Sequence, residues 1–212
     1  MSQEMIRLIP LTPENRQAAE QNMVHVNALL RPHMRDWSQR LTTLVNSKLP
    51  VAMRMRGLYK VAGEITDLAA PHSVCKRGCS ACCHMATLVS LPEAEMIAKA
   101  VGVKMRMPKR WPFFSPRTGA AMDARDDFAA SFHAESKPCT FLVNNECSIY
   151  EHRPLACRIH LNMGANAEPC QMDAARETAM LNLHSLDDAY AMIGRTTQLQ
   201  DIREYFPHGA RR

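Results

Sequence analysis

Four cysteines stand within the nine residues from Cys75 to Cys83 of the segment CKRGCSACCH, and the last two of them are adjacent. Free thiols are reactive, so such a concentration indicates a disulfide framework, a metal or cluster site, or a reactive thiol centre. A second group of cysteines follows in PCTFLVNNECSIYEHRPLACRIH and just after it. This group consists of Cys139, Cys147, Cys157 and Cys170. We expect the fold to bring the two groups together.

The start of the chain helps to decide between a disulfide framework, a metal or cluster site and a reactive thiol centre. MSQEMIRLIPLTPENRQ has no basic segment followed by an apolar one, so we expect no secretory signal peptide. No apolar run approaches the roughly 18 residues that a membrane-spanning helix needs. We therefore expect a cytoplasmic protein with no membrane partner, in which thiols stay reduced. Eight cysteines in such a chain more often bind metal or do chemistry than form disulfides.

The composition is that of a globular protein, with 46% hydrophobic and 22% charged residues. The net charge is +5, and five basic residues with no acidic ones fall between Val103 and Thr118, among Trp111, Phe113 and Phe114. Basic residues interleaved with aromatic ones can bind nucleic acid. Three prolines in the same segment favour a connecting loop instead. We do not expect a nucleic-acid partner, and the sequence names no protein or small-molecule partner.

The first third of the chain has apolar residues at intervals of three and four, which is typical of helices. Thr12-Pro13-Glu14 is a helix start, and the pattern after it predicts one long helix, kinked at Pro32. The inward-facing residues of this helix are predicted to be Met23, Val26, Leu30, Met34, Trp37, Leu41 and Leu44. A second helix is predicted after Pro50, with Met53, Leu58, Val61, Ile65 and Leu68 facing inward.

Further helices are predicted after the first cysteine group. Ser90-Leu91-Pro92-Glu93 is a capping box that opens a helix, and Gly102 closes it. Another helix fits residues 119–135. The tail from Cys170 to Phe206 predicts helices, one of them capped by Ser185.

One pair of short strands completes the expected fold, because Asn144-Asn145 is a typical hairpin turn. The fold class is therefore mostly α: a helical domain with an irregular cysteine-rich centre and a short β-hairpin. We expect one compact domain in three parts. These are an N-terminal helical segment (residues 1–70), a cysteine-cluster metal-binding region (residues 71–170) and a C-terminal helical segment (residues 171–212).

The spacing of the first cysteine group limits what it can hold. On a regular helix Cys75 and Cys82 would be seven residues, or about 10 Å, apart along the axis. Thiolates on one zinc ion lie only roughly 4 Å from one another. Either Gly78 breaks the helix into a turn, or the thiolates hold something larger, such as an iron–sulfur cluster.

The adjacent pair Cys82-Cys83 adds a second constraint, because neighbouring side chains point apart. The two thiols therefore serve different ions, or one of them is not a ligand. Eight cysteines would also suit two sites of four thiolates each.

The stretch RPLACR favours a thiolate at Cys157. Pro154 suits the start of a helix, which places Cys157 near its positive end. That helix end, together with Arg153 and Arg158, is expected to lower the pKa of the thiol. Two histidines next to cysteine positions, His84 and His160, could complete a site or hydrogen-bond a sulfur.

Taken together, the two cysteine elements resemble the CxxCxxCC cysteine-cluster proteins, a YkgJ-like family described as zinc- or iron-chelating. CKRGCSACCH corresponds to the first family element, with three residues rather than two between Cys75 and Cys79. The segment from Pro138 to Arg158 follows the second element almost residue for residue. Some relatives resemble flagellin lysine N-methylase, which implies a possible methyl transfer from S-adenosylmethionine.

The predicted function is a cysteine-thiolate metal-binding protein that holds an iron–sulfur cluster, with zinc as the alternative cofactor. The predicted ligands are Cys75, Cys79, Cys82, Cys83, Cys139, Cys147, Cys157 and Cys170. Whether the protein is an enzyme stays open: a lysine N-methylase-like or redox activity is the alternative function, although no Gly-rich cofactor loop is visible. The cysteine spacing also occurs in radical S-adenosylmethionine enzymes, but their alternating strand–helix pattern is absent from the sequence.

Overall fold

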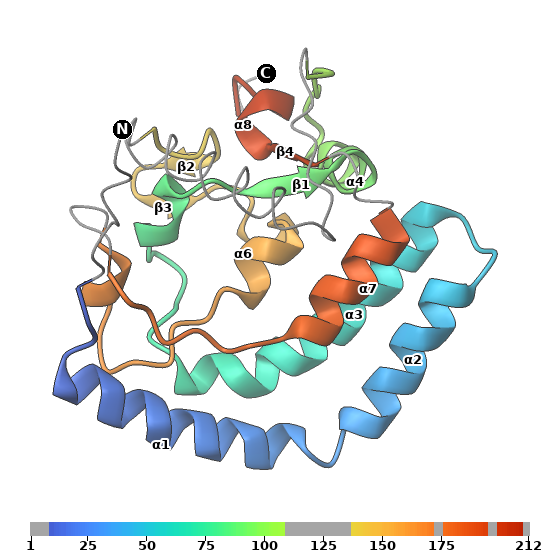
Figure 1. Ribbon diagram of the computed structural model, residues 1–212. Coiled ribbons are helices and arrows are strands. Elements are labelled where there is room, and N and C mark those ends of the chain that lie inside the picture. The colour runs from blue at the N-terminus through green and yellow to red at the C-terminus, as the bar shows by residue number, and fades with distance from the viewer. Residues whose placement is uncertain (1–8, 109–136, 172–175, 195–198, 210–212) are drawn as a thin grey trace, which may run out of the picture.

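Helices dominate the computed structural model, which describes residues 9–108, 137–171, 176–194 and 199–209 (Figure 1). The α-helices are α1 (Pro13–Leu30), α2 (Met34–Asn46), α3 (Val51–Ala69), α4 (Leu91–Val101), α6 (Leu155–Ile159), α7 (His184–Gly194) and α8 (Ile202–Tyr205). The strands are β1 (Leu88–Ser90), β2 (Leu142–Val143), β3 (Glu146–Cys147) and β4 (Leu199–Asp201). The predicted mostly-α fold with a short hairpin is confirmed.

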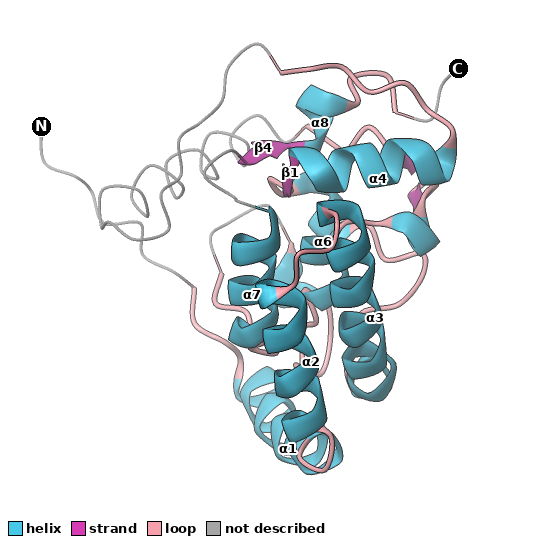
Figure 2. Ribbon diagram, turned by 90° about the vertical axis from the view of Figure 1, so that its right-hand side faces the viewer, coloured by secondary structure: helices cyan, strands magenta, loops and turns pink. Residues whose placement is uncertain are grey.

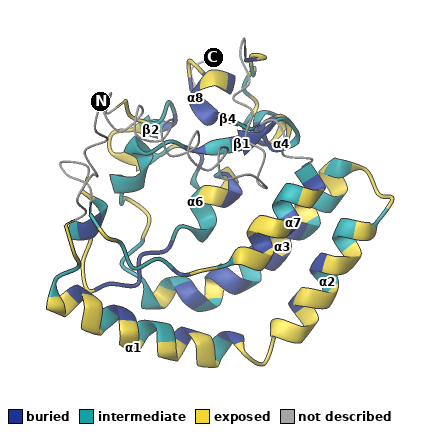
Figure 3. Cartoon of the chain, in the orientation of Figure 1, coloured by how far each residue is buried: buried dark blue, intermediate teal, exposed yellow. Residues whose placement is uncertain are grey.

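Four helices form what we call the helical layer: α1, α2, α3 and α7. Helix α3 packs against the other three and also against α4 and α6. Helix α7, from the other end of the chain, lies along α2 and α3 (Figures 1 and 2). The inner faces of these helices are buried and the outer faces of α1 and α2 are exposed (Figure 3), as an amphipathic pattern requires. Val26, Leu30, Trp37, Leu41, Leu58, Val61 and Ile65 are buried as predicted.

The single long N-terminal helix was a wrong prediction. Helix α1 ends at Leu30 and α2 begins at Met34, so Pro32 lies in a turn between two helices. Proline has no N–H to donate, so a helix ends there as readily as it bends. Met34 and Met53 were predicted to face inward, but they are 61% and 49% exposed.

The second part of the structure, which we call the cysteine layer, comprises residues 75–101, 137–157 and 199–209. Its own hydrophobic core includes Val89, Ile97, Phe141, Ile202, Tyr205 and Phe206. Strand β1 pairs antiparallel with β4, with Leu88 opposite Asp201, so the tail of the chain closes onto the segment after the first cysteines. Strands β2 and β3 form the predicted hairpin, and Asn144 and Asn145 have φ of 51° and 62° as its turn requires.

Some helix ends differ from the sequence predictions. Gly102 ends α4 with φ of 68°, as predicted, but the Ser90 hydroxyl makes no capping bond at its start. Helix α7 begins at His184, so Ser185 lies inside its first turn, and the Asn182 side chain accepts a hydrogen bond from the His184 N–H. Strand β4 was not predicted. The predicted helix at 119–135 lies outside the described residues, as does most of the basic and aromatic segment.

The fold bears on two further expectations, the absence of a membrane-spanning helix and the absence of a β/α barrel. Within the described ranges, none of the helices combines the length and apolar character needed to cross a bilayer. The same ranges hold two small sheets, each an antiparallel pair of strands. The β/α barrel of radical S-adenosylmethionine enzymes is therefore not formed by this part of the chain.

Candidate metal centre

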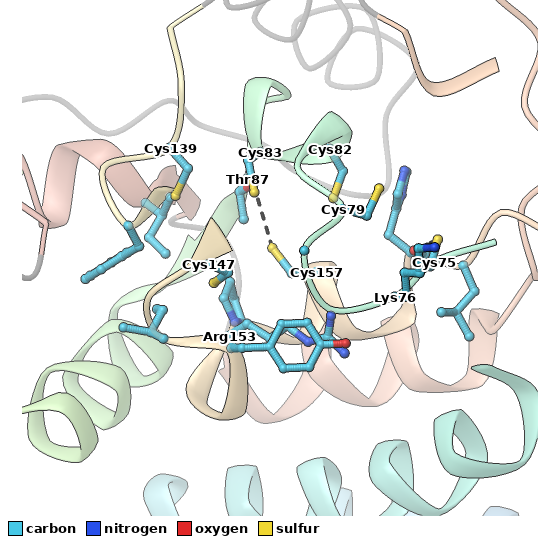
Figure 4. Close-up of a pocket in the computed structure, with 18 of the residues that line it drawn as sticks. Cys75, Lys76, Cys79, Cys82, Cys83, Thr87, Cys139, Cys147, Arg153 and Cys157 are labelled. Atoms are coloured by element: carbon cyan, nitrogen blue, oxygen red, sulfur yellow. Dashed lines mark hydrogen bonds between the residues drawn. The ribbon is translucent and has the colours of Figure 1, made fainter. Parts of the chain in front are cut away.

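Seven of the eight cysteines line one cavity of about 80 Å³ (Figure 4). They are Cys75, Cys79, Cys82, Cys83, Cys139, Cys147 and Cys157. Ala70 and Leu161 of the lining belong to or pack on the core of the helical layer, while Phe141 and Ile202 belong to that of the cysteine layer. All eight cysteines are free thiols. The two cysteine groups thus meet between the two cores, as expected.

The first cysteine group folds as a turn and not as a helix. Gly78 has φ of +88°, a conformation that favours glycine, and the Cys79 N–H donates to the Lys76 carbonyl at 3.0 Å. A 3-10 helix, Ala81–His84, then carries Cys82 and Cys83. Gly78 therefore breaks the run into a turn, which is the backbone fold that the first of the two alternatives requires.

A direct backbone bond joins the two cysteine groups. The Cys139 N–H donates to the Cys83 carbonyl at 2.7 Å. The guanidinium of Arg203 donates to four carbonyls on both sides of this bond, at 2.8–3.2 Å. These carbonyls belong to Cys83, Met85, Lys137 and Pro138.

Arg203 is itself held by a buried ion pair. Its Nη1 lies 2.9 Å from Oδ2 of Asp201, and the two side chains are only 9% and 0% exposed. The same Asp201 oxygen accepts from the Thr87 N–H at 2.8 Å. Sequence reasoning missed both residues, since a single Arg and Asp in a tail carry no signal of where their partners lie.

A buried carboxylate fixes α6, the helix that carries Cys157. The Leu155 N–H, at the start of α6, donates to Oε1 of Glu93 at 2.7 Å. The hydroxyls of Tyr59 and Tyr190 also donate to Glu93. Glu93 therefore ties α6 to α3, α4 and α7, and burial raises its pKa. The capping-box pattern located this residue but not its role.

A model of a protein family matches the part of the chain that contains these cysteines. The model of the CxxCxxCC family, described as “Putative zinc- or iron-chelating domain”, matches residues 74–177. Residues 74–177 are thus a CxxCxxCC domain. The resemblance carried by Cys75 to Arg158 is thus confirmed, and the matched CxxCxxCC domain extends past Cys170. No curated protein and no solved structure matches the chain.

The thiols of the CxxCxxCC domain differ in how easily they ionise. The hydrogen bond with the Cys83 thiol lowers the pKa of Cys82 to about 7, against the effect of burial and with help from the charge of Arg153. The same bond, with burial, raises the pKa of Cys83 far above its ordinary value. Burial raises the pKa of Cys139 to about 11. Cys82 is therefore the thiol most ready to become a thiolate.

The prediction of a low pKa for Cys157 was wrong for the metal-free protein. Burial raises its pKa, and the neighbouring charges of Cys82 and Cys139 raise it further. Its Sγ contacts the Thr87 hydroxyl at 4.0 Å. Of the two histidines, His160 lines the cavity and burial lowers its pKa, while His84 is not among the lining residues.

The donor atoms that line the cavity are mainly cysteine sulfurs. Thiolates are soft ligands that select zinc and iron–sulfur clusters. As the side chains of the described residues lie, no three Cys, His, Asp or Glu groups are arranged to hold one metal ion. The donors thus have the chemistry of a zinc or iron–sulfur site, and they surround a cavity instead of converging on a point.

Proposed function

We propose that the CxxCxxCC domain holds an iron–sulfur cluster through thiolates from both cysteine groups. The observation that carries this proposal is that seven thiols, from segments far apart in sequence, line one cavity. A buried ion pair and a set of backbone bonds hold these segments together. Such an arrangement of reactive thiols has no evident use in packing alone, because cysteine is only a small apolar residue there.

The arrangement of the sulfurs supports a cluster over a single ion. Four thiolates on zinc must converge to roughly 4 Å from one another, and the described thiols do not converge in this way. A cluster separates its ligands more widely and is held by cysteines in loops. Zinc remains the alternative, since the turn at Gly78 is the sharp fold that a compact site requires.

Several residues of the chain would support the bound group. Arg153 lines the cavity and its charge lowers the pKa of Cys82, after the effect of the Cys83 hydrogen bond. A cation there offsets the negative charge of several thiolates. Arg203 fixes the backbone of Cys83 and of the residues before Cys139. We further propose that the domain works in a reducing compartment, because all its thiols are free.

Element analysis after strictly anaerobic purification tests this proposal. We expect iron and acid-labile sulfide in equal amounts, with broad visible absorbance that dithionite bleaches. Colourless protein with stoichiometric zinc would replace the cluster by the alternative. Protein that carries neither metal, even after anaerobic reconstitution with iron and sulfide or with zinc, would refute the thiolate site altogether.

A further inference from the structure

Asn162 is a buried polar residue whose two nitrogen atoms each donate to a cysteine sulfur. Its backbone N–H donates to Sγ of Cys75 at 3.3 Å, and its side-chain Nδ2 donates to Sγ of Cys170, also at 3.3 Å. The residue is 0% exposed. Cys75 lines the thiol cavity, whereas Cys170 is the one cysteine that does not. Asn162 therefore connects the cysteine outside the cavity to a cysteine in its wall.

The other bonds of the Asn162 amide decide which of its atoms faces Cys170. Oδ1 accepts from the Gly164 N–H at 2.9 Å, and Nδ2 also donates to the Asn166 carbonyl at 3.2 Å. Turning the amide over would place a donor against the Gly164 N–H and an acceptor against the Asn166 carbonyl. The group that faces the Cys170 sulfur is therefore an N–H donor.

The backbone of Asn162 is held by several segments of the chain. It forms an antiparallel bridge with Met180, and its carbonyl accepts from the Val74 N–H at 3.1 Å. In the loop that follows, Oδ1 of Asn15, a second asparagine with 0% exposure, accepts from the Asn166 N–H at 3.2 Å. A residue fixed in this way presents its donors to both sulfurs without rearranging.

Donors of this kind suit a sulfur that has lost its proton. The Cys75 thiol donates to the His160 carbonyl at 3.6 Å and accepts from the Asn162 N–H. When metal replaces the thiol proton, the bond to His160 is lost and the bond from Asn162 remains, because a thiolate still accepts. Outer partners hold metal ligands in orientation, and hydrogen bonds to ligand sulfurs help to set the reduction potential of an iron–sulfur cluster.

We propose that Asn162 is a positioning residue of the metal centre, and that it brings Cys170 into that centre beside Cys75. The inference rests on the proposed function and adds to it a residue that binds sulfurs and not the metal. It holds for a cluster and for zinc alike, because thiolates bind both.

The variants N162D and C170S test the proposal. Aspartate keeps an acceptor for the Gly164 N–H and the backbone bond to Cys75, but it has no N–H for Cys170. The measured quantity is the rate at which a chelator removes metal from the anaerobically reconstituted protein. Both variants should raise this rate, and N162D should raise it roughly 10–100-fold, in line with the loss of metal affinity when an outer partner is removed.

The double variant N162D/C170S separates positioning from a merely structural role. If Asn162 acts through the Cys170 sulfur, the double variant should lose metal about as fast as C170S alone. N162A adds no charge and should give the same pattern in both backgrounds. An Asn162 substitution that raises the rate by the same factor with and without Cys170 would overturn the proposal.

N22D is the matched control, because it makes the same exchange of amide for carboxylate next to Asn162. The Asn22 side chain donates to the Met163 carbonyl at 2.8 Å instead of to a sulfur. N22D should therefore leave the rate of metal loss unchanged. A rate raised as much by N22D as by N162D would overturn the proposal.

C170S keeps the proposal falsifiable even where the Asn162 variants lose their helical circular dichroism. A C170S protein that retains metal as the wild type does would overturn the proposal and leave the proposed function intact. A wild type that carries no metal after reconstitution would instead refute the proposed function. The two failures are therefore distinguishable in the same experiment.

Discussion

The helical layer and the cysteine layer are held together by different kinds of interaction. Apolar side chains at helical spacing bury the inner faces of α1, α2, α3 and α7, and many positions share that stabilisation. The cysteine layer has short elements and depends on single polar residues, above all Arg203 and Asp201. Single substitutions should therefore destabilise the helical layer, where many apolar positions share the stabilisation, less than the cysteine layer, where single polar residues make the key contacts.

Each layer contains an arginine–carboxylate pair, and the pairs differ in exposure. Arg40 and Glu64 of the helical layer lie 2.6 Å apart with side chains 32% and 36% exposed. Arg203 and Asp201 of the cysteine layer are 9% and 0% exposed. Water screens the first pair and not the second. Replacing the arginine by leucine should therefore lower the free energy of unfolding more in the second pair than in the first.

Replacing the buried arginine should have the largest effect. R203L leaves Asp201 charged and buried and removes the donors of four carbonyls, so we expect a loss of about 3–5 kcal/mol in the free energy of unfolding. The matched control R40L should cost only about 0–1 kcal/mol. Urea denaturation of both variants measures the difference, and equal losses would contradict the contrast between the layers.

A smaller effect should follow from alanine at two glycines. Gly209 has φ of +60°, and a Cβ there would clash with the Thr140 carbonyl oxygen, so G209A should cost about 1–3 kcal/mol. Gly63 lies within α3, where a Cβ meets nothing within 4 Å. G63A should therefore stabilise the protein by roughly 0.4–1 kcal/mol. Thermal melts that rank the two variants in the opposite order would refute the placement of Gly209.

The smallest effects should be opposite pH dependences of two glutamates. Burial raises the pKa of Glu93 above its ordinary value of 4.5, so its ionisation opposes folding. The stability of the wild type relative to E93Q should be complete below pH 4.5 and fall as pH rises from 4.5 through the raised pKa. The Arg40 hydrogen bond lowers the pKa of Glu64 from 4.5 to about 2. The stability of the wild type relative to E64Q should therefore be complete above pH 4.5 and fall as pH approaches 2.

Unfolding free energies of the wild type, E93Q and E64Q, measured from about pH 2 to neutral pH, check the signs of both pH dependences. The two differences should change in opposite directions with pH. A stability difference between the wild type and E93Q that does not vary with pH would show that Glu93 is not buried as described.

The two layers also differ in how much the sequence reveals. The intervals between Val26 and Ile65 predicted the buried faces, because period and burial are local properties. The break at Pro32 was placed correctly but interpreted as a kink, since sequence alone does not say whether a proline bends or ends a helix. The Asn144-Asn145 turn was predictable because few residues adopt positive φ.

At the candidate metal centre, the residue types of the site were predictable and their long-range partners were not. The cysteines and Gly78 stand out by type and spacing. Arg203 contacts carbonyls more than 60 residues away, and carbonyls are the same at every position, so no pattern marks them. The raised pKa of Cys157 depends on burial, which the helix-end argument does not include.

The central claim is that thiols from both cysteine groups bind metal together, and peptide-resolved alkylation tests it most directly. The reconstituted protein and its chelator-treated form would be exposed to iodoacetamide, and the labelling rate of each cysteine would be measured by mass spectrometry. We predict that Cys79 and Cys82 of the first group and Cys139 and Cys157 of the second are all protected by metal. Its removal should raise the labelling rates of all four, most of all that of Cys82, whose pKa is lowered to about 7. Equal labelling rates with and without metal, or protection confined to one group, would contradict the account.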